Sequence, residues 1–282
     1  MHALREFLLI HALTCLMQHG KISKSGSSEY VKNVFLLIFI YFFSALGSEI
    51  IKGKIAKEKA MQYMASVQNN NLHKCGGFLV SEDFVMTAAH CADKNPTSVV
   101  LGTHNLKKVD KKMRYGIQKM CKHPSFKSGS FANDIMLLKL SRKVRLGNEK
   151  TIKRIQLPIQ KINLKENKMC SVAGWGATET KGKNSNELQV VSVPIINKKK
   201  CQKLWGNRTP KNVICAGGYN TKNGICQGDS GGPLVCNKLP LGIASFNNNN
   251  SCNYPNIPNV YTDVSKFLPW IKDILKKKKC KV

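Results

Sequence analysis

From residue 50 onward, short runs of β-branched and aromatic residues alternate with turns rich in Gly, Asn, Pro and Lys. Runs of this kind, about ten residues apart, are typical of antiparallel β-barrels or sandwiches. The clearest predicted strands are residues 98–102, 171–176, 189–194 and 233–236. Residues 76–87 predict a hairpin, and the asparagine tracts 69–71 and 247–250 predict loops. We therefore expect an all-β chain.

The last segment follows a different period. Residues 264–275 space their apolar side chains as a short amphipathic helix does. Pro269 is compatible with the first turn of such a helix and with no later position. No internal repeat accompanies these elements.

Two apolar stretches precede the β-structure, at 7–17 and 34–47. The second follows Lys32 and ends in small residues, as the core of a signal peptide does. It falls short of the ~20 apolar residues that a spanning helix needs, so we expect no stable membrane span. Residues 1–47 are thus predicted to be a leader. Its position inside the chain leaves three alternatives: an extended leader, a true start further downstream, or a signal anchor formed by the first stretch.

Eleven cysteines in 282 residues indicate an oxidising compartment. No Cys-x-x-Cys pair is present, so a zinc site is a poor explanation and we predict neither a metal nor a cofactor. The length allows one large all-β domain or two small ones.

Three polar side chains stand out by their local sequence. His90 lies in Thr-Ala-Ala-His-Cys, Asp134 begins an apolar run, and Ser230 lies in Gly-Asp-Ser-Gly-Gly-Pro. A hydroxyl, an imidazole and a carboxylate together can form an activated nucleophile. The alternative is a glycine loop, a core histidine and a strand aspartate that are unrelated in space. The other histidines are expected on the surface or in loops: His2, His11, His19, His73, His104 and His123.

These three segments, in the order His, Asp, Ser, resemble those of the chymotrypsin-like (S1) serine proteases over residues 50 to about 275. The resemblance implies two six-stranded antiparallel β-barrels with a C-terminal helix, a linker near 145–165, and the three side chains in the cleft between the barrels. It implies a nucleophile (Ser230), a general base (His90), an orienting carboxylate (Asp134) and an oxyanion hole made by the N–H groups of Gly228 and Ser230. The helix would direct Phe267, Trp270, Ile271 and Ile274 toward the second barrel.

The same resemblance implies four disulfides: Cys75–Cys91, Cys170–Cys236, Cys201–Cys215 and Cys226–Cys252. Cys15 would leave with the leader. Cys121 and Cys280 have no partner in the common pattern of the family. They could pair with each other and tie the helix to the first barrel, or one could be free, so that the protein is a monomer in the first case and a dimer in the second. Cys121 could also be an inert buried thiol.

Residues 48–49, Ser-Glu, precede an Ile50-Ile51 start, which resembles the activation dipeptide of granzymes and mast-cell proteases. The segment 61–68 also resembles their first strand. In this group the freed amine of Ile50 would pair with Asp229 and order the site in a catalytic domain of residues 50–282. Lys52 departs from the glycine that is usual there. A granule or extracellular location, with a role in immune defence, is implied.

The resemblance also locates a substrate pocket. Gly224, six residues before Ser230, would lie at its floor beside Ile225, with Asn247 and Asn259 on its wall and base. Ser245 and Phe246 would offer a strand edge to the substrate backbone. These pocket residues offer no negative charge to a Lys or Arg side chain of the substrate. Residue 259 is also not an arginine, which could bind an acidic side chain of the substrate. We therefore expect a medium-sized uncharged P1 residue such as Met, Leu or Asn.

From Ile50 onward the chain has 41 Lys and Arg residues against 13 Asp and Glu residues. Such an excess favours polyanions such as heparin and other sulfated proteoglycans. The lysine runs 198–200 and 276–279 could equally be solvated surface, and no base-reading motif suggests specific nucleic-acid binding. Besides a protease acting on proteins or peptides, we therefore consider a cationic proteoglycan-binding or antimicrobial protein on the same fold. Glycosylation at the sequons of Asn207 and Asn249 stays open.

Overall fold

The computed structural model describes residues 53–147, 152–206, 208–248, 251–254 and 256–280. All of them lie in one compact unit, Ser48–Val282. The leader, the dipeptide 48–49 and Ile50 fall outside the described residues, as do both sequon asparagines. None of the described helices is long and apolar enough to cross a membrane.

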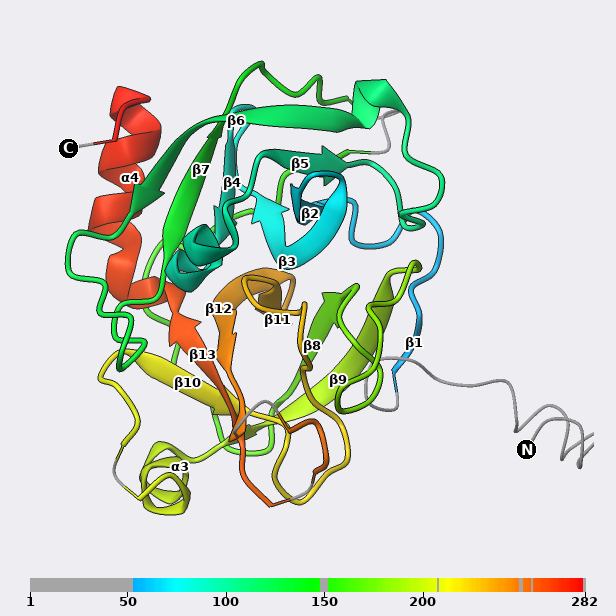
Figure 1. Cartoon of the computed structure of the whole chain (residues 1–282). Helices are drawn as coiled ribbons and strands as arrows, with labels where there is room; N and C mark the ends of the chain where they lie inside the picture. The colour runs from blue at the N-terminus through cyan, green and yellow to red at the C-terminus, as the bar shows by residue number, and fades with distance from the viewer. Residues whose placement is uncertain (1–52, 148–151, 207, 249–250, 255, 281–282) are drawn as a thin grey trace, which may run out of the picture. The chain divides into compact units, whose positions relative to one another are not determined.

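The first barrel occupies the upper half of Figure 1. Its antiparallel strands close in the order β2-β3-β4-β7-β6-β5. Their bounds are β2 (Met64–Asn69), β3 (Leu72–Leu79), β4 (Phe84–Thr87), β5 (Ser98–Leu101), β6 (Arg114–Lys122) and β7 (Met136–Leu140). Large apolar side chains fill its interior, with Phe78, Phe84 and Leu137 fully buried. Closure leaves no exposed strand edge.

The second barrel lies below it in Figure 1. Its strands follow the order β9-β10-β13-β12-β11-β8, the pairing of β8 with β9 closes the ring, and β1 (Lys54–Ile55) pairs with β9 outside it. The bounds are β8 (Met169–Gly174), β9 (Gln189–Ile196), β10 (Val213–Ala216), β11 (Pro233–Cys236), β12 (Leu239–Phe246) and β13 (Asn259–Asp263). The prediction of two six-stranded antiparallel barrels is confirmed.

The four strands and the hairpin predicted from the apolar pattern are confirmed, as β5, β8, β9 and β11 and as β3–β4. The described residues between β7 and β8, where a linker was expected, contain no helix or strand. Short helices between the described strands are η1 (Ala89–Lys94), η2 (Lys111–Met113) and α3 (Lys198–Leu204).

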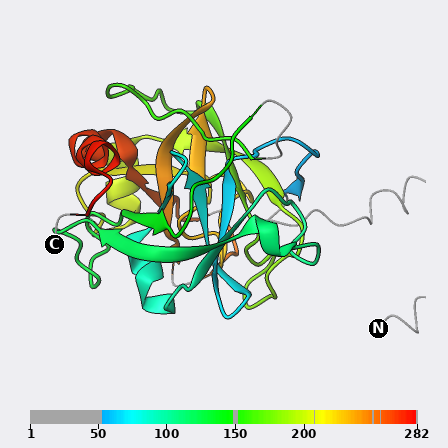
Figure 2. The same cartoon turned by 90° about the horizontal axis from the view of Figure 1, so that it is seen from above.

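The chain ends in η4 (Val264–Phe267) and α4 (Leu268–Lys277), with Pro269 in the first turn of α4 as predicted. The predicted packing direction is wrong. Phe267, Ile271 and Ile274 belong to the buried cluster of the first barrel, and the His123 ring lies 5.1 Å from the rings of Phe267 and Trp270. Helical spacing identifies the buried face of a helix but not the surface that covers it. Figures 1 and 2 show α4 beside the first barrel.

Five disulfides join the described residues. Four are the pairs that the resemblance implied: Cys75–Cys91, Cys170–Cys236, Cys201–Cys215 and Cys226–Cys252. The fifth joins Cys121 on β6 to Cys280 after α4. It links the C-terminal segment covalently to the first barrel, and neither cysteine is left as a free thiol.

Candidate active site

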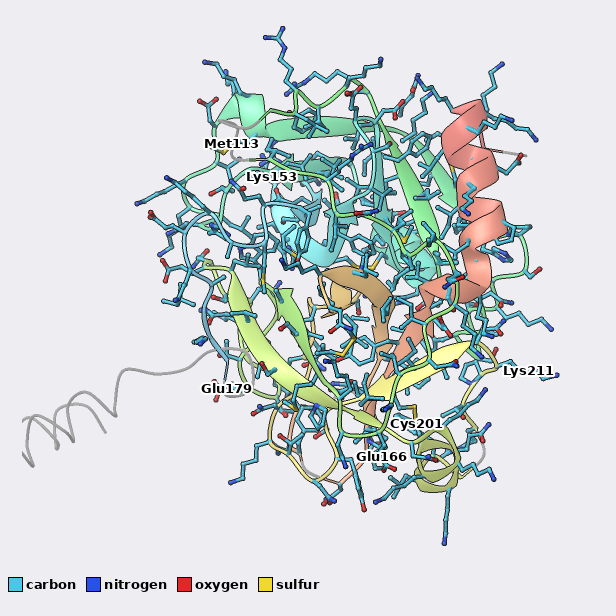
Figure 3. All side chains as sticks on the ribbon, turned by 180° about the vertical axis from the view of Figure 1, so that it is seen from behind. Met113, Lys153, Glu166, Glu179, Cys201 and Lys211 are labelled. Carbon is cyan, nitrogen blue, oxygen red and sulfur yellow. A yellow bond between two sulfur atoms is a disulfide. The ribbon has the colours of Figure 1, made fainter. Side chains whose placement is uncertain are left out.

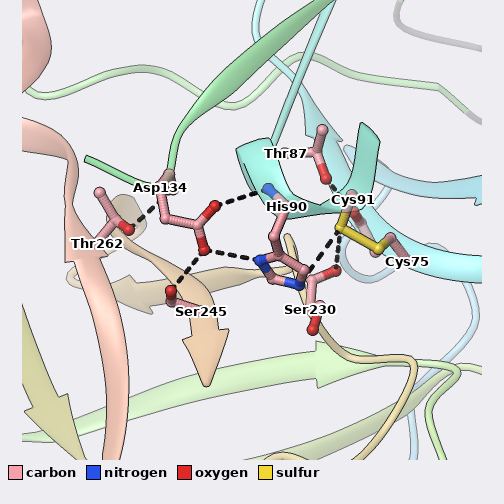
Figure 4. A network of polar contacts seen from close by, with 9 residues as sticks. Cys75, Thr87, His90, Cys91, Asp134, Ser230, Ser245 and Thr262 are labelled. Carbon is pink, nitrogen blue, oxygen red and sulfur yellow. Dashed lines mark hydrogen bonds and ion pairs between the residues drawn. A yellow bond between two sulfur atoms is a disulfide. The ribbon is translucent and has the colours of Figure 1, made fainter. Parts of the chain in front are cut away.

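His90 follows the end of β4, and Asp134 precedes the start of β7. These two strands pair in the first barrel, with Thr87 beside Met136. β4 leads into η1, which carries His90, and Asp134 directly precedes Ile135 and β7. His90 Nδ1 donates to Asp134 Oδ2 at 2.8 Å, and the His90 backbone N–H donates to Oδ1 at 2.9 Å (Figure 4). Because an ionised carboxylate only accepts, the proton of a neutral imidazole sits on Nδ1 and leaves Nε2 as an acceptor.

The second barrel also holds Asp134, whose side chain is completely buried. Ser245 Oγ on β12 donates to Oδ2 at 2.5 Å, and Thr262 Oγ1 on β13 donates to the Asp134 backbone carbonyl at 2.9 Å. A buried carboxylate is costly unless it is hydrogen-bonded, and here three donors meet its two oxygens. The carboxylate is therefore fixed in place and fixes the imidazole in turn.

Ser230 lies on a tight turn just before β11. Its backbone carbonyl accepts from Gly76 N at 2.8 Å, and the next residue, Gly231, adopts a φ of +83° in close contact with the first barrel. The Ser230 hydroxyl has no hydrogen-bond partner among the described residues. It opens instead into a pocket of about 270 Å³ that His90 and Gly228 also line. The structure thus brings the three predicted side chains to one place.

The turn before Ser230 presents two backbone donors. Within the described part of the chain, the N–H groups of Gly228 and Ser230 have no internal acceptor. Gly228 has a φ of +95°, and a Cβ atom there would lie 2.9 Å from Gly176 Cα. Only glycine suits this position, because both the backbone angle and the space exclude a side chain. The turn can therefore hold an oxyanion.

His73 supports this turn, a role that no sequence motif indicates. It lies on β3 and not in a surface loop, so that expectation is wrong for His73; His104 and His123 do lie in loops. His73 Nε2 donates to the Gly228 carbonyl at 3.0 Å, and Nδ1 lies 2.8 Å from Ser66 Oγ. Burial lowers the pKa of His73 to about 4. A neutral imidazole therefore orients the Gly228 peptide.

Asp229, between the two donors, is buried and does not line the pocket. Its carboxylate accepts from Gly176 N and Cys226 N, both at 2.9 Å. Burial raises the pKa of Asp229 to about 7. None of the ion pairs among the described residues includes it.

The predicted pocket residues divide into two groups. Ile225, Ser245, Phe246 and Asn247 line the open pocket beside Ser230. Gly224 and Asn259 do not, because the Tyr254 ring lies against Gly224. Sequence reasoning missed Tyr254, which follows Cys252 in a loop without a recognisable motif.

Two aromatic rings, Phe131 and Phe246, line the site beside His90, and Trp205 packs against Phe246. The ring centroids of Phe131 and His90 lie 5.5 Å apart, those of Phe131 and Phe246 5.4 Å, and those of Trp205 and Phe246 5.2 Å. Phe131 and Trp205 were not predicted.

Cys75, His90 and Cys91 also lie close enough together for metal ligation. Both sulfurs are in a disulfide, however, so no thiolate ligand is available.

The comparisons with known proteins agree with this geometry. The family model described as Trypsin matches residues 50–271. The chain belongs to the trypsin family. Its relatives include granzyme B of Rattus norvegicus, which is 40% identical over 86% of this chain and 99% of that protein. Cathepsin G of Homo sapiens is 36% identical over 86% of this chain and 93% of that protein. The chain is therefore a serine-type endopeptidase.

Among solved structures, a human heparin binding protein is similar with a TM-score of 0.71 and 31% identity. The match covers 82% of this chain and 98% of that one. Among the side chains drawn in Figure 3, nitrogen-tipped ones project on several sides of this view, and Lys211 lies at its edge.

Proposed function

We propose that this endopeptidase is granzyme-like and hydrolyses peptide bonds through an acyl-enzyme on Ser230. The observation that carries the proposal is the shared pocket of Ser230, His90 and Gly228, with His90 held by the buried carboxylate of Asp134. The substrate would lie along the strand edge at Ser245–Asn247, with an uncharged P1 side chain beside Ile225.

In this mechanism, Ser230 Oγ attacks the scissile carbonyl while His90 Nε2 takes its proton. The negative charge that develops on the carbonyl oxygen meets the N–H groups of Gly228 and Ser230. His90 then returns the proton to the leaving amine, which departs and leaves the acyl group on Ser230. Water repeats the sequence and releases the acid. Asp134 keeps the imidazole in the required tautomer and stabilises the imidazolium.

A covalent probe tests this assignment. An enzyme starting at Ile50 is expected to react with a fluorophosphonate, whereas Ser230→Ala removes the labelled site and His90→Ala slows labelling at least ~1,000-fold. Ser192→Ala, an exposed serine on β9, is the matched control and keeps the wild-type rate. A folded wild-type protein that is not labelled would refute the proposal.

The buried carboxyl group of Asp229 supports activation by exposure of the Ile50 amine. A buried carboxylate whose pKa is raised by burial gains stability when a cation reaches it, and the freed amine would supply that charge. A chain that starts at Ser48 is expected to be nearly inactive and one that starts at Ile50 active. Equal labelling of the two would exclude this step. A leader of residues 1–47 and secretion into granules or the extracellular space complete the proposal.

A second role, binding of sulfated proteoglycans, is favoured by the formal net charge of +29. The similar human protein is called heparin binding, which supports the same idea. Retention on a heparin column should weaken as salt rises, because the Debye length falls from about 8 Å at physiological salt to about 3 Å at 1 M. Elution at or below physiological salt would contradict a granule-proteoglycan role. Loss of labelling with retained heparin binding would favour a binding protein.

A further inference from the structure

The side chain of Tyr254 occupies the base of the primary pocket. A Cβ atom at Gly224 would lie 2.5 Å from Tyr254 Cε2 and 2.8 Å from Cζ. A Cβ atom at Gly218 would lie 3.1 Å from Cε1 of the same ring. The ring therefore packs against the backbone of both glycines, in space that a long substrate side chain would otherwise enter.

The Tyr254 hydroxyl is fixed by three polar groups. It donates to the Ile225 carbonyl at 2.5 Å and accepts from Asn259 Nδ2 at 2.8 Å and Asn247 Nδ2 at 3.4 Å. One donor bond and two acceptor bonds use the full capacity of a hydroxyl. The Asn259 amide is fixed in the same way, since its Oδ1 accepts from Ile225 N at 3.1 Å. Displacing the ring would leave Nδ2 of the fully buried Asn259 without its acceptor, which opposes such a movement.

The open volume agrees with this arrangement. The pocket of about 270 Å³ beside Ser230 is lined by Ile225 and Cys226 and reaches neither Gly224 nor Asn259. This volume extends along His90, Phe131 and Phe246 as well, so only part of it is available to a P1 side chain. Burial raises the pKa of Tyr254 to about 12, so its hydroxyl stays neutral and offers no countercharge to Lys or Arg.

We propose that Tyr254 is a specificity-determining residue that closes the base of the primary pocket and restricts P1 to small uncharged side chains such as Ala, Ser and Val. The proposal rests on the proposed protease function of the same site. It replaces the medium-sized P1 residue expected from the glycines and asparagines of the pocket by a smaller one, because the Tyr254 ring fills the space beside Gly224.

The test uses the enzyme starting at Ile50 and peptides that differ only at P1. Wild type is expected to cleave Ala and Val peptides with a kcat/KM at least about 10-fold above that for Leu, Phe and Arg peptides. Tyr254→Ala should raise kcat/KM for the Leu and Phe peptides at least about 10-fold and change that for the Ala peptide less than about 3-fold. Tyr254→Phe keeps the ring and should keep the wild-type order.

The matched control is Asn253→Ala, the exposed neighbour in the same loop. Fluorophosphonate labelling measures the fraction of active enzyme in each preparation. A wild type that is not labelled would contradict the protease function, whereas the P1 preference of a labelled enzyme tests the role of Tyr254. A labelled wild type that prefers Leu, Phe or Arg would overturn the proposal even if Tyr254→Ala does not fold. It is overturned too if a labelled Tyr254→Ala keeps the preference for Ala.

Discussion

Removal of the Cys121–Cys280 disulfide should destabilise the protein and leave its chemistry intact. The double variant Cys121→Ala/Cys280→Ala is the suitable perturbation, because alanine buries no new hydroxyl at the buried Cys121 position. The disulfide connects β6 to the end of the chain. The helix α4 would keep its own contacts without it, since Leu268, Ile271 and Ile274 remain buried in the first barrel.

The magnitude follows from the length of chain that the disulfide closes. A sequence separation of 159 corresponds to about 5 kcal/mol of unfolded-state entropy at 25 °C. The Cys170–Cys236 disulfide already shortens the closed path to about 95 residues, but the logarithmic dependence lowers the value only slightly. Disulfides typically contribute about 2–4 kcal/mol, which for a domain of this size corresponds to a fall in Tm of about 10 °C.

Thermal unfolding followed by near-UV circular dichroism, without reductant, measures this effect. Fluorophosphonate labelling at 25 °C is the control and should be unchanged. The denatured wild type starting at Ile50 should contain no free thiol, because its cysteines all lie in the five disulfides. Two free thiols, a disulfide-linked dimer, or a Tm change below about 2 °C would refute the reasoning.

Three further predictions concern the site. Asp134→Asn should lower kcat about 10,000-fold by favouring the wrong His90 tautomer, as steady-state kinetics on an Ala peptide would show, and a loss below 10-fold would count against it. Gly228→Ala should lower kcat/KM at least about 100-fold in the same assay with the protein still folded, whereas unchanged kinetics would exclude Gly228 from oxyanion binding. Unfolding free energy should fall as pH decreases from about 6.5 to about 4, because unfolded His73 binds a proton that the folded state excludes. Urea titrations should show a smaller decrease, by up to about 3 kcal/mol, for His73→Gln; an equal decrease would assign the effect to other groups.

The strands could be predicted from sequence because that information is local, whereas their closure into two barrels was implied by the family resemblance. Each strand is a short apolar run, and the motifs around His90, Asp134 and Ser230 are contiguous in the chain. A local motif does not contain information on which distant segment of the chain packs against it. The amphipathic spacing of α4 was correct, yet its covering surface was assigned to the wrong barrel, because that choice depends on how β13 directs the chain across the molecule.

His73 was missed for the same physical reason. Its bond to the Gly228 carbonyl spans 155 residues, and its neighbours on β3, Leu72 and Lys74, give no sign of burial. A lone histidine between polar and apolar neighbours is indistinguishable from a surface residue until the other barrel is in place. Contacts between the barrels therefore set the limit of what the sequence could predict here.

The site itself depends on those contacts in both directions. The second barrel supplies Ser245 and Thr262 to Asp134, and the first barrel supplies His73 to the Gly228 turn. The local motifs supply the reacting groups, and this reciprocal packing of the two barrels holds them in place. The residue that we propose to determine substrate choice, Tyr254, lies elsewhere, in a loop after Cys252 that belongs to neither barrel's strands. A loop can change without disturbing the barrels, so the same catalytic geometry is compatible with many pockets. The reacting groups could thus be predicted from local motifs, while the proposed size of the P1 residue depends on the placement of the Tyr254 ring.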